Sequence, residues 1–316
     1  MTFTITGGIT FSGGGVTVTA PPIIKKAIFG YGFNGTVNLS MTNLVSITGV
    51  VATDTTGVGT IRQGLAAAGY GNDKAIFGYG SSGGAVSMTN LVSNTGVVSI
   101  DTTGVGTART TLAAASYGTD KAIFGYGNSS AAASMTNLVS NTGVVASNTT
   151  GVGSSRYILA AAGYGTDKAI FGYGYNFDGV PFQTLSMTNL VSNTGVVGND
   201  VTGVGSSRYG LAGAGYGTDK AIFGYGNSGA AVSMTNLVSN TGVVASNTTG
   251  VGTARWLLSA AGYDLDKAIF GYGATTTPTT TYQSITNLVS NTGVVASDTT
   301  GVGTVRNYLA ASGYSS

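Results

Sequence analysis

The sequence contains no cysteine, no histidine and no glutamate. The lack of cysteine excludes disulfides and thiolate metal sites, and the lack of histidine further disfavours zinc. Only 8% of the residues are charged and the net charge is +2, so we expect no electrostatic attraction to nucleic acid or anionic membranes. No apolar run is long enough for membrane insertion, and the first residues, MTFTITGGITF, lack the basic start and apolar stretch of a signal peptide.

The chain does contain a repeat. The heptapeptide KAIFGYG occurs six times at intervals of 47–52 residues, and a block close to SMTNLVSNTGVV recurs in phase with it. The copies begin at Lys26, Lys74, Lys121, Lys168, Lys220 and Lys267, and each is followed by one arginine, at Arg62, Arg109, Arg156, Arg208, Arg255 and Arg306. Periods of this length indicate a solenoid, a propeller or an array.

Each period predicts four short strands separated by turn residues. They are LAAAGYG, KAIFGYG, SMTNLVS and a segment that runs through GVVASDTTGVG toward the arginine. No sustained helical spacing of apolar residues occurs. The strands also lack clean alternation of apolar and polar residues, which favours sheets covered on both faces, as in stacked propeller blades.

The first period lacks its first strand, and the chain ends after Arg306 with that strand alone, NYLAASGYSS. We therefore expect Leu309–Tyr314 to pair with Lys26–Gly32 and close a circle. The prediction is an all-β, six-bladed β-propeller over residues 25–316, with four antiparallel strands per blade and the first blade closed by the C-terminal strand. The Ala- and Gly-rich first strands are predicted to lie at the central axis, where space is smallest.

The order of these elements resembles the kelch propeller family: an arginine, a small-residue strand, a tight turn and a strand ending in glycine. The paired glycine of kelch is Gly-Tyr-Gly here, and the kelch tryptophan is absent from the fourth strand. The blocks KAIFGYG, NLVSNTGVV and DTTGVGTAR, over Lys26 to Tyr314, also resemble repeats in predicted structural proteins of tailed phages of marine bacteria. This resemblance implies a virion protein, located in an extracellular particle.

Nearly all the charges belong to the repeat. Besides the arginines, an aspartate precedes the repeat lysine at Asp73, Asp120, Asp167, Asp219 and Asp266. A ring of such charges could grip a ligand. The alternative is structural, because aspartate stabilises turns and arginine can tie neighbouring blades through several donors. Repetition favours the structural interpretation.

Catalysis and cofactor binding find little support in the sequence. The carboxylates outside the repeated positions, Asp178 and Asp264, could in principle form a glycosidase pair, but both are typical of turns. GVGTAR lacks the lysine of a phosphate-binding loop and precedes a strand. No calcium-loop motif is present. We therefore predict no catalytic residue, no metal site and no cofactor.

Two segments vary between the repeats: the loop after KAIFGYG and the two residues after the arginine. In an up-and-down blade both lie at the same edge, which we call the rim. The rim is predicted to carry Tyr157, Tyr175, Phe177, Phe182, Tyr209, Trp256, Tyr282 and Tyr308. Aromatics on loops of a rigid scaffold favour binding, for example of sugars, although some of them could simply pack against the first strand.

Residues 1–24 lie outside the repeat and carry no charge. FTIT, ITFS and VTVTA predict strands, so we interpret this segment as a β arm that attaches to other virion proteins or to another copy. The sequence thus predicts a non-enzymatic structural, decoration or fibre-type component of a phage-like particle. Its rim would bind a partner, or a glycan or protein of the host surface. The alternative is a soluble glycan-binding propeller lectin.

Overall fold

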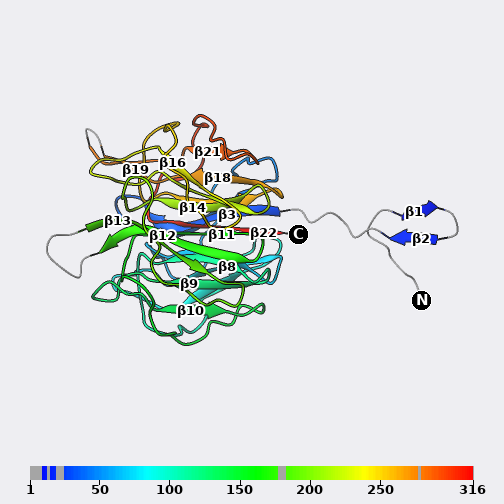
Figure 1. The fold of residues 1–316 in the computed structure, drawn as a ribbon, viewed down its shortest axis with the longest axis horizontal. Helices are drawn as coiled ribbons and strands as arrows, with labels where there is room; N and C mark the ends of the chain where they lie inside the picture. The colour runs from blue at the N-terminus through cyan, green and yellow to red at the C-terminus, as the bar shows by residue number, and fades with distance from the viewer. Residues whose placement is uncertain (1–8, 13–14, 19–24, 177–182, 277–278, 316) are drawn as a thin grey trace.

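The computed structural model describes residues 9–12, 15–18, 25–176, 183–276 and 279–315, which form an all-β fold (Figure 1). Most of the strand residues belong to six three-stranded antiparallel sheets. The sheets are β22–β3–β4 (Ala310–Ser315, Lys25–Phe33, Asn38–Val45), β5–β6–β7 (Ala66–Tyr70, Lys74–Gly78, Thr89–Val92), β8–β9–β10 (Ala113–Tyr117, Lys121–Gly125, Thr136–Val139), β11–β12–β13 (Ala160–Tyr164, Lys168–Asn176, Gln183–Val191), β14–β15–β16 (Ala212–Tyr216, Lys220–Gly224, Thr235–Val238) and β17–β18–β21 (Ser259–Tyr263, Lys267–Gly271, Thr286–Val289).

Two further sheets have two strands each. β1 (Ile9–Ser12) pairs with β2 (Gly15–Val18), and β19 (Ala274–Thr275) pairs with β20 (Thr281–Tyr282). ITFS and most of VTVTA, predicted as strands, therefore form β1 and β2. The predicted strand FTIT lies outside the described residues.

The predicted pairing between the two ends of the repeat region is present. β22 lies antiparallel to β3, in a register that runs from Ala310 opposite Gly30 to Ser315 opposite Lys25. The last strand of the chain thus completes the sheet that begins with the first KAIFGYG.

The prediction of four strands per repeat differs from the structure, in which each sheet has three. The fourth segment makes only isolated bridges to the third strand, such as Val51 to Val45 and Thr55 to Thr42 in the first repeat. Between these bridges, the Asn43 amide donates to the Ala52 carbonyl and to the Asp54 carboxylate, each at 2.9 Å. An asparagine side chain here takes the place of the regular backbone ladder, so the segment does not form a strand.

The six sheets contact one another in a cyclic order. The first strand of each sheet contacts the first strand of the next, through β22, β5, β8, β11, β14 and β17 and back to β22. A ring of backbone hydrogen bonds follows the same path. The N–H of Gly64 donates to the Tyr308 carbonyl, and the ring continues with Thr111 to Gly64, Ile158 to Thr111, Gly210 to Ile158, Leu257 to Gly210 and Tyr308 to Leu257, at 2.6–3.0 Å.

A second ring joins the hairpins between the first and second strands of neighbouring sheets, and in the first sheet the paired ends of β22 and β3 take the place of a hairpin. Its bonds run from the N–H of Gly71, Gly118, Gly165, Gly217, Asp264 and Ser315 to the carbonyls of Asp120, Asp167, Asp219, Asp266, Lys25 and Asp73, at 2.7–3.0 Å. Both rings return to their starting points, so each sheet has a neighbour on either side.

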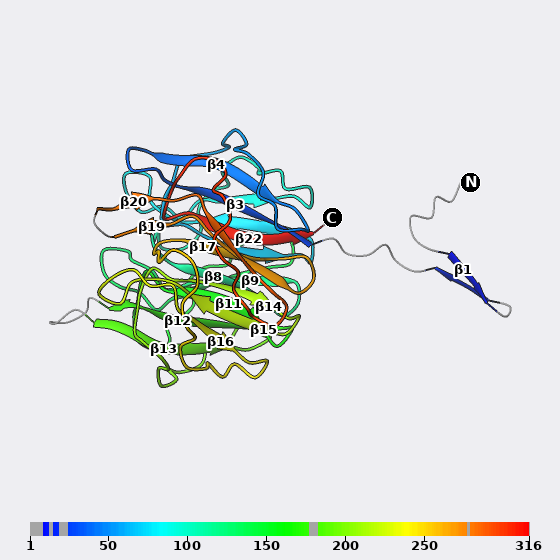
Figure 2. The same ribbon diagram turned by 90° about the horizontal axis from the view of Figure 1, so that it is seen from above.

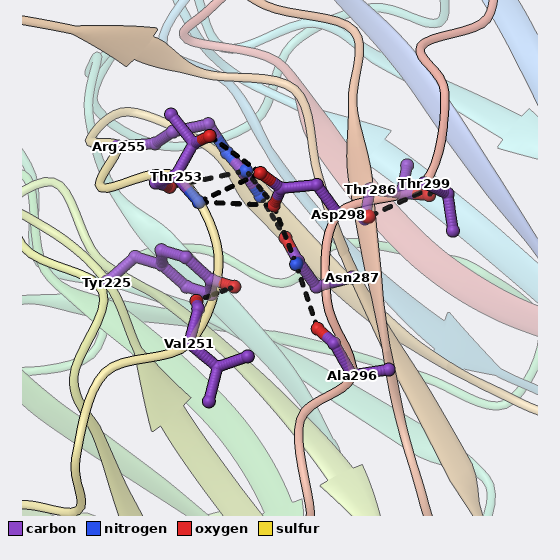
Figure 3. A network of polar contacts seen from close by, with 9 residues as sticks. All are labelled: Tyr225, Val251, Thr253, Arg255, Thr286, Asn287, Ala296, Asp298 and Thr299. Carbon is purple, nitrogen blue, oxygen red and sulfur yellow. Dashed lines mark hydrogen bonds and ion pairs between the residues drawn. The ribbon is translucent and has the colours of Figure 1, made fainter.

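The Gly-Tyr-Gly of each repeat has a packing explanation. In the fifth repeat, Tyr225 has a φ of 65° and is fully buried, and its hydroxyl donates to the Val251 carbonyl at 3.1 Å (Figure 3). A Cβ on Gly224 would lie 2.7 Å from Cζ of Phe270 in the next sheet. The core is thus divided among the gaps between adjacent sheets, and each gap is filled by the same side-chain types.

The ring of sheets has two different faces (Figures 1 and 2). The projecting ends of β12, β13, β19 and β20 lie on one side, which is the rim. The start of β3 and the C-terminal end of β22 lie on the opposite side. We call that side the constant face, because the hairpins between first and second strands and the turns that follow the third strands change little between repeats. The described residues include no helix that could cross a membrane.

Candidate functional site

The structure brings the two variable segments of the sequence together at the rim. Residues that follow the repeat arginine make backbone bridges to residues that follow KAIFGYG in the next repeat. These bridges are Gln63 to Ser81, Thr110 to Asn128, Tyr157 to Tyr175, Tyr209 to Asn227, Trp256 to Ala274 and Asn307 to Phe33. The variable side chains therefore project from backbone segments that are paired with each other.

Four of the predicted rim aromatics form a continuous row. Ring centroids lie 5.6 Å apart for Tyr157 and Tyr175, 5.3 Å for Tyr175 and Tyr209, and 5.7 Å for Tyr209 and Trp256. The row crosses three consecutive sheets, and all four side chains are partly exposed. Edge-to-face and tilted contacts of this kind hold aromatic rings in place while part of each ring stays accessible.

The Trp256 indole Nε1 is buried and has no hydrogen-bond partner. Buried donors are normally paired in folded proteins, so this donor stands out on the rim.

Two other predicted rim residues lie nearby. Tyr282 contacts Phe33, with ring centroids 6.0 Å apart. Burial raises the pKa of Tyr308 to about 12, and the neighbouring Tyr209, Tyr157 and Tyr282 add to this effect. Tyr308 also belongs to the first ring of backbone hydrogen bonds, which runs from Gly64 to Leu257, so it packs beneath the rim. Phe177 and Phe182 lie outside the described residues.

Phe33 is an aromatic rim residue that the sequence prediction missed. It follows the first KAIFGYG at the position that Tyr175 occupies in the fourth repeat. Comparison of that single position across the repeats could have identified it.

The arginines occupy the gaps between sheets, and Figure 3 shows one of them, Arg255. Arg255 is fully buried, and its guanidinium lies 4.8 Å from the ring centroid of Tyr225. In the next sheet, Nη2 donates to Oδ1 of Asn287 at 2.6 Å, and Nη1 lies 3.4 Å from the Asp298 carboxylate. One cation thus contacts a ring on one side of the gap and polar groups on the other.

The same contacts recur around the molecule. They join Arg62 to Tyr31 and Asn90, Arg109 to Tyr79 and Asn137, Arg156 to Tyr126 and Asn189, Arg208 to Tyr173 and Asn236, and Arg306 to Tyr272 and Asn43. All six arginines are fully buried. No ligand could reach these cations without separating the sheets.

The aspartates beside the arginines predict acid sensitivity. Burial alone would raise the pKa of Asp298. Hydrogen bonds from Thr253 and Asn287 and the charge of Arg255 lower this pKa by more than burial raises it, so the net shift is downward. The net shift is also downward for Asp54, Asp101 and Asp200. A carboxylate with a lowered folded-state pKa stabilises the fold above its unfolded-state pKa of about 3.9, and this stabilisation is lost as the pH falls through the folded-state pKa.

We therefore expect stability to fall below about pH 4 as these carboxylates take up protons. Asn148 and Asn247 occupy the same position in the other two repeats. They accept hydrogen bonds from Asn137 and Asn236, the equivalents of Asn287, so the site accepts asparagine. Replacement of all four aspartates with asparagine should flatten the pH dependence. Denaturant midpoints between pH 2 and pH 7 would measure this, and equally steep curves for both proteins would contradict it.

The repeat lysines and their preceding aspartates form ion pairs at the constant face. The Nζ–carboxylate distances are 2.7–2.9 Å for Lys74, Lys121, Lys168 and Lys220. Lys267 instead lies 2.6 Å from Asp264 and 4.0 Å from Asp266. The bond from Lys267 holds the pKa of Asp264 below its ordinary value, which does not suit a general acid.

The partner suggested for Asp264 in a glycosidase pair, Asp178, lies outside the described residues. Within the part of the chain that the structure describes, no three acidic side chains gather in a way that could hold a metal ion. A cavity of about 290 Å³ opens on the axis at the constant face and is lined by Tyr70, Tyr117, Tyr164, Tyr216, Tyr263 and Tyr314.

Comparison of the chain with protein-family models and with curated proteins gives no match.

Proposed function

We propose that the six sheets are the blades of a closed, kelch-like β-propeller, and that the protein is a non-enzymatic structural component of a phage-like particle. Two closed rings of backbone hydrogen bonds, one at each end of the axis, support the propeller. An open solenoid would leave its end repeats with one neighbour each, whereas here β22 completes the sheet of β3.

The proposed role of this propeller is to present the rim to a partner or to a host surface. The observation that carries the proposal is the row formed by Tyr157, Tyr175, Tyr209 and Trp256, which lies where the repeats differ most. Rigid aromatic groups supply much contact energy at little entropic cost, and loops on a fixed scaffold commonly carry binding. Placement in a virion rests on the sequence resemblance.

A glycan-binding lectin outside any particle is the second candidate. It is favoured by the partly exposed rings of Tyr209 and Trp256, because sugars can stack their apolar faces on accessible aromatic rings. In either role the same rim makes the contact, and the partner differs.

The test is binding by the full chain to a printed glycan array, together with co-purification with capsid or tail proteins. Replacement of both Tyr209 and Trp256 with alanine should weaken rim binding by about 30-fold, the effect of losing a hot spot worth about 2 kcal/mol. Lys121→Ala, on the constant face, is the matched control and should bind normally.

Thermal melting of each variant would show whether it is folded. Unchanged binding by a folded Tyr209→Ala, Trp256→Ala protein would remove the rim from the proposal. Glycan binding without co-purification would favour the lectin, and co-purification without glycan binding would favour the particle component.

A further inference from the structure

The constant face carries an exposed valine in every repeat, in the turn after the third strand. These valines are 65–66% exposed: Val50, Val97, Val144, Val196, Val243 and Val294. The turns contact the hairpins that carry the repeat lysines and their preceding aspartates. For example, the Asn240 amide donates to the Asp219 carboxylate at 3.0 Å, and a Cβ on Gly71 would lie 2.8 Å from the Asn141 carbonyl oxygen. The valines and the ion pairs therefore share one surface.

The turn does not require valine at this position. The contacts of Val97 with Ser93 use its backbone N–H and carbonyl only. Three residues further on, the exposed position varies freely among the repeats: it holds Thr53, Ile100, Ser147, Asn199, Ser246 and Ser297. The face therefore repeats one exposed apolar side chain six times, beside a position whose residue differs between the repeats.

The charges on the same surface indicate what kind of partner fits. Each of the second to sixth repeats places a lysine next to an aspartate, so charges of both signs alternate around the face. A partner of one charge sign would meet repulsion at every repeat. A surface with the same alternation can be rotated until each lysine faces an aspartate.

We propose that the constant face binds the constant face of a second copy of this chain. A partner that satisfies six repeated valines and five repeated ion pairs must repeat its own contacts around the same axis, and a second copy does so. A two-fold interface of this kind is self-complementary, with valines meeting valines and ion pairs meeting ion pairs. The dimer turns its two rims away from each other, which makes it bivalent.

Sedimentation velocity of the full chain, between about 1 and 100 µM, tests this proposal. The native protein should sediment with twice the mass of one chain at the upper concentrations. Triple replacement of Val97, Val144 and Val243 with aspartate should weaken association at least 100-fold, because each copy gains three unpaired carboxylates at the interface. Val37→Asp, which is equally an exposed valine but on the rim side between β3 and β4, is the matched control and should still dimerise.

The milder replacement of the same three valines with threonine preserves side-chain shape and guards against misfolding of the aspartate variant. It should weaken the dimer about tenfold while the melting temperature stays unchanged. A native protein that stays monomeric at 100 µM overturns the proposal. So does a dimer that survives both triple variants, which would place the contact elsewhere, for example in residues 1–24. Neither result depends on whether the rim binds a ligand.

Discussion

Replacement of Arg255 with methionine is expected to destabilise the protein by about 3–5 kcal/mol, the usual cost of removing one partner from a buried charged pair. Arg255 has no exposed surface, and its loss leaves Oδ1 of Asn287 unpaired inside the gap between two sheets. The Asp298 carboxylate loses its cation, and the Tyr225 ring loses the guanidinium packed on it. Methionine replaces only the aliphatic part of these contacts.

The matched control is Lys220→Met in the same repeat. Lys220 also forms an ion pair, at 2.9 Å from Asp219, but its side chain is 45% exposed. Exposed pairs contribute about 0–1 kcal/mol, so this variant should unfold close to the native midpoint. Urea unfolding with a constant m-value would compare the two variants, and similar losses for both would contradict a structural role for the buried arginines.

Removal of residues 309–316 is expected to abolish the folded state. The deletion removes β22 and the preceding Leu309, with the buried side chains of Leu309 and Tyr314, and leaves the inner edge of β3 unpaired. Each large buried apolar side chain contributes about 1.5–3 kcal/mol. The lost contacts with β5, β17 and β3 bring the total close to the about 5–15 kcal/mol that stabilises a typical domain. Circular dichroism and size-exclusion chromatography would reveal an unfolded or aggregated chain.

A circular permutant separates the effect of closure from the effect of changing the ends. Ser315 lies opposite Lys25, so a short linker can join the present C-terminus to residue 25. New ends between Thr119 and Asp120 would open the equivalent hairpin in the third repeat while all three strands of every sheet are kept. This permutant should melt near the native temperature. A truncated chain as stable as the permutant would show that the pairing of β22 with β3 does not hold the ring together.

The sequence predicted well wherever the signal was local and repeated. KAIFGYG combines β-branched and aromatic residues between turn residues, and it forms the central strand of all six sheets. The missing first strand before Lys26 and the extra one after Arg306 correctly predicted the pairing of β22 with β3. The prediction of a fourth strand was wrong. The side chains of Asn43 and its equivalents hydrogen-bond the fourth segment, where a strand would have made backbone hydrogen bonds instead.

The site was only partly predictable. The position of the two variable segments on one side follows from an up-and-down order of strands, and the bridge from Tyr157 to Tyr175 agrees with it. The row from Tyr157 to Trp256 could not be derived in advance, because it depends on how neighbouring sheets are rotated relative to each other.

The sequence by itself determined the all-β class, the number of repeats and the way the two ends of the repeat region meet, because these depend on local residue preferences and on their order along the chain. Only the tertiary structure decided which side chains meet across the gaps. Arg306 bonds Asn43 from 263 residues away, and Trp256 lies against Tyr209 from the previous repeat. Such contacts form because packing the sheets removes both groups from water together, and local residue preferences do not encode which groups those are.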